Sequence, residues 1–189
     1  MEKIIYLQKI GKLDQSLLIN LMNNLERELN EFKIRVKIFE DILTLTNLEY
    51  DISKEQYNAS KILKNIKKKF IDKDVFRIIG ILDEDIYSKN HNFVFGLASM
   101  KSGVAVISLT RLRENFYKKT SSLYRKHETR KNVEDRLLKE AIHELGHTFG
   151  LLHCNNLCVM QFSHALKDTD KKPPDFCNSC LNLLRQVLN

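Results

Sequence analysis

Long apolar runs are missing from this sequence of 189 residues. No uninterrupted apolar stretch approaches the roughly 20 residues that a membrane-spanning helix requires. The run nearest the N-terminus, Ile4–Leu7, has four residues and is too short for the core of a secretory signal peptide. We therefore expect no membrane partner and no export, and we predict a cytoplasmic location.

Proline and glycine are also scarce, with two prolines and six glycines in the whole chain. This scarcity favours regular elements joined by short connections, and the sequence contains no internal repeat or low-complexity segment. Hydrophobic residues make up 43% of the chain, which is ordinary for a globular protein. We predict a single domain, residues 1–189, with a monomer as the default state.

Positive charge is in excess, and the formal net charge is +7. The basic residues cluster at 67–69, 118–119 and 125–131, but no nucleic-acid-binding motif accompanies them and aromatic residues do not alternate with them. A nucleic-acid binder therefore rests on composition alone. We interpret the clusters as solvated surface and expect no specific nucleic-acid partner.

The N-terminal third reads as strand, helix, strand. Lys3–Gln8 is rich in isoleucine, and Phe32–Phe39 alternates apolar and basic residues, which is typical of a half-buried strand. Between them, Asp14–Leu29 carries leucines at helical spacing, with Asp14 as its N-cap. This order favours a right-handed crossover between two parallel strands.

The middle of the chain adds a helix and three strands. We expect the helix at Asn58–Phe70 and a central strand at Phe76–Leu82. The last two strands, Phe93–Ala98 and Gly103–Leu109, are joined by the short link 99–102, which predicts an antiparallel hairpin. The predicted fold class is α/β (α+β), with a mixed, mostly parallel twisted sheet of about five strands flanked by helices.

Four further segments complete the predicted order of elements. The acidic turn 83–85 could bind a cation, although a polar exit from the strand is the preferred interpretation. Thr110–Arg130 is expected to be a mobile connection. Asn132–Phe149 is predicted to be a helix with Asn132 as its N-cap, and residues 150–189 read as an almost helix-free C-terminal part. The core stripe of the helix would be Val133, Leu137, Ala141 and Leu145.

The helix at 132–149 places His143 and His147 one turn apart on the same face, so both imidazoles can reach one metal ion. Gly150 would allow a sharp, left-handed end to the helix, which would return His153 to the same ion. Three imidazoles leave one position open for water, as in a catalytic zinc site. Zinc lowers the pKa of such a water to about 7. Glu144 could then act as general base on it and deliver the proton to a leaving amine.

The motif HExxHxxGxxH is complete from His143 to His153, so chance is a poor explanation for it. The alternative is a helix whose histidines merely pack or cap. That plainer interpretation is preferred for His91, His127 and His164 taken singly.

All four cysteines lie in the last 36 residues. The CxxC pair Cys177 and Cys180 has the spacing of a zinc knuckle. With Cys154 and Cys158, four thiolates would form a closed, structural zinc site that folds a tail with little core of its own, residues 155–176. Free, buried or redox-active thiols are the alternative.

These motifs together resemble the archaemetzincin family of metzincin metallopeptidases. The long histidine motif, the Cys158-Val159-Met160 sequence and the downstream CxxC carry the resemblance. The resemblance implies a zinc peptidase with two zinc ions. Met160 would be the Met-turn methionine beneath the site. The implied ligands are His143, His147 and His153 for the catalytic zinc and Cys154, Cys158, Cys177 and Cys180 for the structural zinc, with Glu144 as general base.

The sequence departs from the family pattern in two spacings. Three residues separate Cys154 from Cys158 where four are expected, and sixteen separate Met160 from Cys177 where seventeen are expected. The resemblance also implies that a peptide substrate pairs with an edge strand, either Asn92–Ala98 or Gly103–Ser108, with Gly96 allowing close backbone approach. The competing hypothesis is a zinc-stabilised peptide- or protein-binding module with the same fold and little or no turnover.

Overall fold

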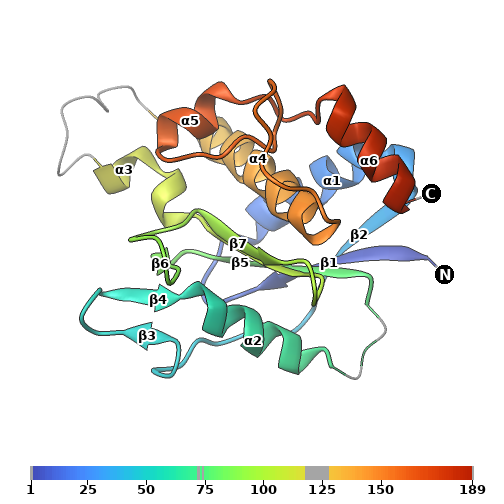
Figure 1. Ribbon diagram of the computed structural model, residues 1–189. Coiled ribbons are helices and arrows are strands. Elements are labelled where there is room, and N and C mark those ends of the chain that lie inside the picture. Colours follow the sequence, from blue (N-terminus) through green and yellow to red (C-terminus); the bar gives the residue numbers. More distant parts are fainter. Residues whose placement is uncertain (1, 72, 74, 118–127, 189) are drawn as a thin grey trace.

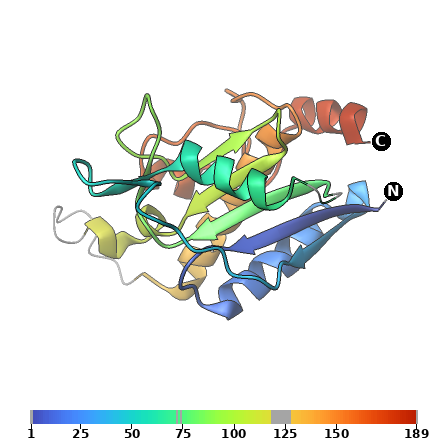
Figure 2. The same cartoon turned by 90° about the horizontal axis from the view of Figure 1, so that it is seen from below.

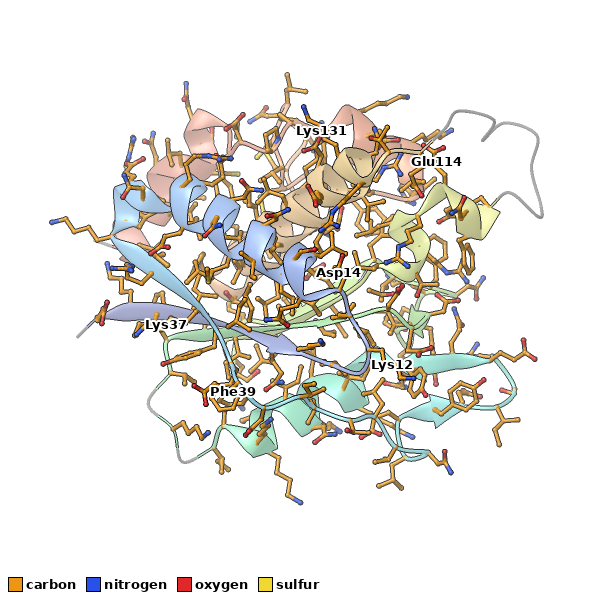
Figure 3. All side chains as sticks on the ribbon, turned by 180° about the vertical axis from the view of Figure 1, so that it is seen from behind. Lys12, Asp14, Lys37, Phe39, Glu114 and Lys131 are labelled. Carbon is orange, nitrogen blue, oxygen red and sulfur yellow. The ribbon has the colours of Figure 1, made fainter. Side chains whose placement is uncertain are left out.

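The N-terminal strands β1 (Lys3–Lys9) and β2 (Ile34–Ile38) lie parallel in the computed structural model, which describes residues 2–71, 73, 75–117 and 128–188. The helix between them, α1 (Gln15–Glu28), begins at Asp14, whose side chain accepts a hydrogen bond from the Ser16 backbone, as predicted. Figure 3 shows Asp14 at this end of α1. Phe32 was wrongly placed in the strand. It is buried in the short helix η1 (Asn30–Phe32), because Lys33 takes a left-handed conformation that separates η1 from β2.

Five strands form the main sheet in the order β2-β1-β5-β8-β7, with β5 (Arg77–Leu82) at its centre as predicted. β7 (Gly96–Ser99) and β8 (Val104–Ser108) form the expected antiparallel hairpin, and the other neighbours are parallel. β7 is shorter than the predicted strand and lies at the edge of the sheet. β8 is paired on both sides, so the expectation that Gly103–Ser108 might be the edge strand was wrong.

Helices cover both faces of this sheet. Figures 1 and 2 show α1 and α4 (Arg130–Thr148) on one face and α2 (Ala59–Lys69) on the other. Because side chains alternate along a strand, neighbouring residues of β5 enter different cores. Ile79 and Ile81 pack towards α1 and α4, whereas Ile78 packs towards α2. The sheet thus separates two hydrophobic cores.

A second, small sheet was not predicted. It contains β3 (Tyr50–Asp51), β4 (Gln56–Asn58) and β6 (Ile86–Tyr87), which are too short to show a periodic pattern in the sequence. The acidic turn before β6 is held by arginines. Asp83 pairs with Arg113 at 2.5 Å, and Asp85 receives two hydrogen bonds from Arg111. Because Asp83 and Asp85 are already paired with arginines, the structure favours interpreting turn 83–85 as a polar end of strand β5 rather than as a cation-binding site.

The long helix α4 begins at Thr129, and the expectation of an N-cap at Asn132 was wrong. The Thr129 side chain caps the helix, and Asn132 is its reciprocal partner three residues later. The expected stripe of Val133, Leu137, Ala141 and Leu145 is buried. Within the predicted mobile connection, the structure places η2 (Thr110–Leu112) and α3 (Glu114–Tyr117). Residues 118–127 lie outside the described part of the chain.

The C-terminal part contains two helices, α5 (Leu166–Lys171) and α6 (Asn178–Leu188), so the expectation of an almost helix-free region was wrong. Leu184 and Leu188 of α6 are buried at i, i+4 spacing, and Figure 1 shows α6 close to the start of β1. The segment before α5 is anchored in the main core, since Val159 and Met160 are fully buried there. Within the described residues, no helix combines the length and apolarity needed to span a membrane.

Candidate active site and metal centres

Three histidines converge at the C-terminal end of α4. His143 and His147 project from the same face of the helix, and their Nε2 atoms lie 3.1 Å apart. One ligand atom from each of His143, His147 and His153 lies within 4.8 Å of the others. Two nitrogens bound to one tetrahedral zinc at the usual bond length would be about 3.3 Å apart. The donor set and its spacing therefore fit a zinc ion.

His153 is brought back by a sharp helix end at Gly150. Gly150 has a φ of +101°, and its N–H donates to His147 O at 3.1 Å. The next N–H, of Leu151, donates to Gly146 O at 3.0 Å. These two bonds form a Schellman motif, whose positive φ favours glycine. The predicted conformational role of Gly150 is confirmed.

Backbone carbonyls orient two of the imidazoles. His143 Nδ1 lies 2.9 Å from Val159 O, and His147 Nδ1 lies 2.8 Å from Leu151 O. A carbonyl oxygen can only accept, so each Nδ1 carries the proton and each Nε2 presents a lone pair towards the other. Burial lowers the pKa of His143 to about 3 and lowers the pKa of both His147 and His153. The imidazoles are therefore neutral, as metal ligands must be.

Glu144 is buried beside the histidines, with 5% of its surface exposed. Burial raises the pKa of its carboxyl group well above the usual range, and the nearby Glu140 carboxylate raises that pKa further. Its Oε2 atom has no hydrogen-bond partner among the described residues. A buried carboxylate oxygen without a partner is costly. The Glu144 residue also lines a cavity.

A buried charged network, which no sequence pattern indicates, lies next to these residues. Lys172 is fully buried, and its Nζ lies 2.8 Å from Oε1 of Glu140, one helical turn before Glu144. The Thr169 hydroxyl donates to the same Glu140 oxygen at 3.2 Å. Burial alone would raise the pKa of Glu140, but Lys172 and the other partners lower it overall. Glu140 is therefore a paired carboxylate beside the unpaired Glu144.

Met160 packs against the inner side of α4, close to the histidines. A Cβ at Gly146 would be too close to Met160 Sδ, so Gly146 provides the space for this contact. The sequence alone favoured ordinary core packing for Met160, and the structure shows a fully buried side chain under the histidine-bearing turn.

A cavity of about 530 Å³ opens over the histidines and Glu144. His91 and His164, which the sequence suggested were ordinary packing residues, also line it. Both face Phe162, whose ring centroid lies 6.0 Å from His91 and 4.6 Å from His164. Phe162 also packs edge-on against His153 at 4.8 Å. Neither histidine belongs to a sequence motif, so no signal could have placed them here.

The four cysteines form the second cluster. Their Sγ atoms lie within 4.8 Å of one another, and Cys154 Sγ is 3.7 Å from Cys177 Sγ. Two thiolates on one tetrahedral zinc at the usual bond length would be about 3.8 Å apart. The backbone N–H groups of Met160 and Cys177 donate to Cys158 Sγ. The donor set therefore fits a closed zinc site despite the two shortened spacings.

Hydrogen bonds and burial act in opposite directions on these thiols. The backbone N–H of Cys180 stabilises the Cys177 thiolate and lowers the pKa of Cys177 to about 6. Burial raises the pKa of Cys158 and Cys180. A cation among the four sulfurs would offset the cost of burying the Cys158 and Cys180 sulfurs as thiolates.

The two clusters share a piece of backbone, because His153 precedes Cys154 directly. The Cys154 N–H donates to Met160 O at 3.0 Å, and this hydrogen bond closes the loop from residue 154 to residue 160. His127 lies outside the described residues.

Comparisons with known proteins agree with this geometry. The sequence profile of Peptidase family M54 matches residues 1–186. A protein named archaemetzincin from Pyrococcus furiosus is 37% identical over 190 residues, which cover 100% of this chain and 95% of that protein. A solved structure of a zinc-dependent peptidase from Methanocorpusculum labreanum has a TM-score of 0.81 at 28% identity, covering 95% of this chain and 99% of that one. The archaemetzincin structure from Methanopyrus kandleri has a TM-score of 0.80 at 30% identity, covering 99% of this chain and 96% of that one.

Proposed function

Because this chain belongs to peptidase family M54, the archaemetzincins, it is a zinc-dependent peptidase, and we propose that His143, His147 and His153 hold its catalytic zinc. The observation that carries the assignment is the convergence of three neutral imidazoles beside a buried, unpartnered carboxylate on the wall of one cavity. Its substrates are peptides or proteins.

Glu144 is the proposed general base. When bound, zinc makes water acidic enough to act as a nucleophile near neutral pH and polarises the peptide carbonyl. Glu144 Oε2 accepts the proton of the attacking water and then donates it to the amine that leaves. The raised pKa of this carboxyl group suits both steps, because the group takes up a proton more readily than an ordinary carboxylate does and can then pass it on.

The edge strand β7 is the proposed peptide-binding strand. The Ser108 N–H donates to Phe95 O, so Phe95 directs its hydrogen-bonding groups towards β8. In an antiparallel pair this direction alternates along the strand. The N–H and C=O groups of Gly96 and Ala98 therefore point to the free edge, where an extended peptide can pair with them.

The four cysteines are proposed to hold a second, structural zinc, which makes two zinc ions per chain. Two features support a closed site: four sulfurs within 4.8 Å of one another and backbone donors aimed at Cys158 Sγ. We further propose that residues 1–189 form one catalytic domain, a metzincin-like fold, which acts as a monomer in the cytoplasm and has no specific nucleic-acid partner.

The test compares digestion of a proteome-derived peptide library by the wild type and by Glu144→Ala. We expect hydrolysis to fall by about 10²–10⁴-fold while the zinc content measured by elemental analysis stays unchanged. Asp135→Ala is the matched control, because it removes an exposed carboxylate from the same helix. An unchanged rate in Glu144→Ala would rule out the proposed mechanism.

The rival hypothesis of a binding module is not favoured. A module that only binds peptides gains nothing from burying the Glu144 carboxylate without a partner for Oε2, which costs about 1–3 kcal/mol. Peptide binding by the wild type with no cleavage at any site in the library would support that module instead.

A further inference from the structure

Gly96 lies against the side chain of Glu144. A Cβ placed on Gly96 would be 2.6 Å from Oε1, 2.7 Å from Cγ and 2.8 Å from Cδ of Glu144. Cβ atoms in folded proteins essentially never lie within 3.0 Å of a heavy atom of a residue that is not their chain neighbour. The carboxylate of Glu144 therefore occupies the volume that any other side chain at position 96 would fill.

Backbone conformation does not explain this glycine. Positive φ angles among the described glycines occur at Gly11, Gly103 and Gly150, and Gly96 is not one of them. Glycine in the interior of a strand weakens the strand, because it supplies no side chain to pack. At Gly96 the benefit that offsets this cost is space.

The face of β7 that meets α4 supplies this space. Gly96 and Ala98 are two residues apart, so their side-chain positions share one face of the strand. Leu97 points to the opposite face and packs in the core beneath α2. Position 96 thus faces Glu144, while its backbone groups point to the free edge of the sheet.

We propose that Gly96 is a positioning residue for the Glu144 carboxylate, a role that rests on the proposed function of Glu144 as general base. The Cα of Gly96 forms a wall against Oε1, Cγ and Cδ, and this contact limits where the carboxylate can lie. A wall of this kind donates no hydrogen bond, so Oε2 keeps its lone pairs for the proton it must accept. A hydrogen-bonding partner would hold the carboxylate equally well but would lower its basicity.

This placement also explains how the base meets the substrate. The peptide would pair with the outward-facing N–H and C=O of Gly96, and the Glu144 carboxylate would lie beside the same residue. Gly96 would then have two effects. Its main-chain N–H and C=O would align the peptide backbone, and its lack of a side chain would leave room for the Glu144 carboxylate.

The first test is Gly96→Ala. The added methyl group must push the Glu144 carboxylate away, and misplacement by about 1 Å can cost about 10²-fold in rate. We expect kcat to fall by about 10–100-fold, with KM and zinc content close to those of the wild type, because the peptide pairs with main-chain groups and the imidazoles do not move. A rise in KM at unchanged kcat would mean that position 96 acts through peptide binding and would overturn the proposal.

The second test removes the Glu144 side of the contact between position 96 and Glu144, and it does not depend on enzymatic turnover. Glu144→Ala deletes the atoms that would meet the new methyl group. Gly96→Ala should therefore lower the melting temperature by about 2–4 °C when Glu144 is present, and should not lower it in the Glu144→Ala background. Equal losses in both backgrounds would show that the methyl group meets something other than Glu144 and would overturn the proposal.

The two tests separate this inference from the proposed function. If the wild type cleaves no peptide, the proposed function fails, whereas the melting temperatures of the four proteins still show whether Gly96 and Glu144 are in contact. If the wild type cleaves peptides and Gly96→Ala retains its full kcat, the positioning role is wrong and the proposed function stands.

Discussion

At the scale of single residues, burial keeps the imidazole of His143 neutral. Only 5% of its surface is exposed, and the pKa of about 3 is far below the usual value of 6.5. Its Nδ1 is already occupied by the Val159 carbonyl, so protonation would have to occur at Nε2, the atom proposed to bind zinc. Acid and metal therefore compete for one nitrogen.

This competition predicts a pH dependence of stability for the metal-free protein. The unfolded chain binds a proton at His143 below about pH 6.5, whereas the folded chain does so only near pH 3. In that window the unfolded state holds more protons, so the free energy of unfolding rises with pH and falls on acidification. Between pH 6.5 and 4.5, His143 alone should lower the free energy of unfolding by about 2–3 kcal/mol. Urea unfolding of the chelator-treated protein at several pH values measures it.

The range between pH 6.5 and 4.5 also separates the effect of histidine protonation on stability from that of carboxylate protonation. The lowered pKa values of Glu49 and Asp51 make those groups lose stabilising charge only at lower pH. A His143→Gln variant should show a flatter dependence between pH 6.5 and 4.5. An equally steep dependence in that variant would assign the effect to other groups.

At the scale of elements, polar contacts from one turn of α4 hold α5 in place. Arg136 makes two hydrogen bonds to the carboxylate of Asp170, Lys139 donates to the Thr169 carbonyl, and Glu140 pairs with Lys172. α5 follows the segment that carries Phe162 and His164, so this docking also fixes one wall of the cavity. Arg136 further reaches Glu114, which Figure 3 labels on α3.

Replacing Lys172 by methionine should destabilise the protein by about 3–5 kcal/mol, because it leaves the Glu140 carboxylate buried without its counter-charge. The Lys172→Met/Glu140→Leu double variant should recover most of that loss, since two apolar side chains can replace a buried ion pair. Urea denaturation midpoints of the two variants and the parent provide the measurement. A double variant that is as unstable as Lys172→Met would show that lost packing, rather than the unpaired charge, causes the effect.

Elements with a strong period or motif could be predicted from the sequence. The leucine stripe of α1, the alternation in β2 and the apolar run of β5 each indicated the correct element. α5 and α6 were missed because α5 has only six residues and prolines at 173 and 174 separate the two helices. Figure 1 shows both helices as the outermost C-terminal elements.

The site followed the same division. The histidine triplet and the four cysteines could be proposed as metal sites because their spacing is local, within eleven residues for the histidines. Glu140 with Lys172, and Phe162 with His91, come together from distant segments, so no sequence period could connect them. Gly96 was singled out for the close approach of a peptide backbone, which stays a prediction, and the sequence did not indicate its contact with the Glu144 side chain.

At the scale of the whole molecule, the C-terminal segment is held at two points. The cysteine cluster ties residue 154 to the start of α6, and the apolar face of α6 packs into the main core through Leu184 and Leu188. The side chain of Lys3 also donates to the Leu188 carbonyl, which links the first strand to the last helix. Loss of the cysteine site should therefore loosen this segment without unfolding the whole chain.

We expect two zinc ions per chain by elemental analysis, and one in Cys177→Ser. The variant should melt on the order of 10 °C below the parent, because a structural zinc contributes several kcal/mol of folding free energy. Ser179→Ala is the matched control, since it alters an exposed residue between Cys177 and Cys180 and keeps all four thiols. Identical melting of Cys177→Ser and the parent would contradict a structural zinc.

The direct bond between His153 and Cys154 has a consequence for how the metals are acquired. An ion held by the four sulfurs would fix the backbone beside His153, so the imidazole site would be assembled before its own ion arrives. Filling the sulfur site first would then raise the affinity of the imidazole site, and thermodynamic reciprocity requires the converse by the same factor. Stepwise addition of zinc to the stripped protein should show an ordered, cooperative uptake in which thiolate absorbance saturates before peptidase activity returns.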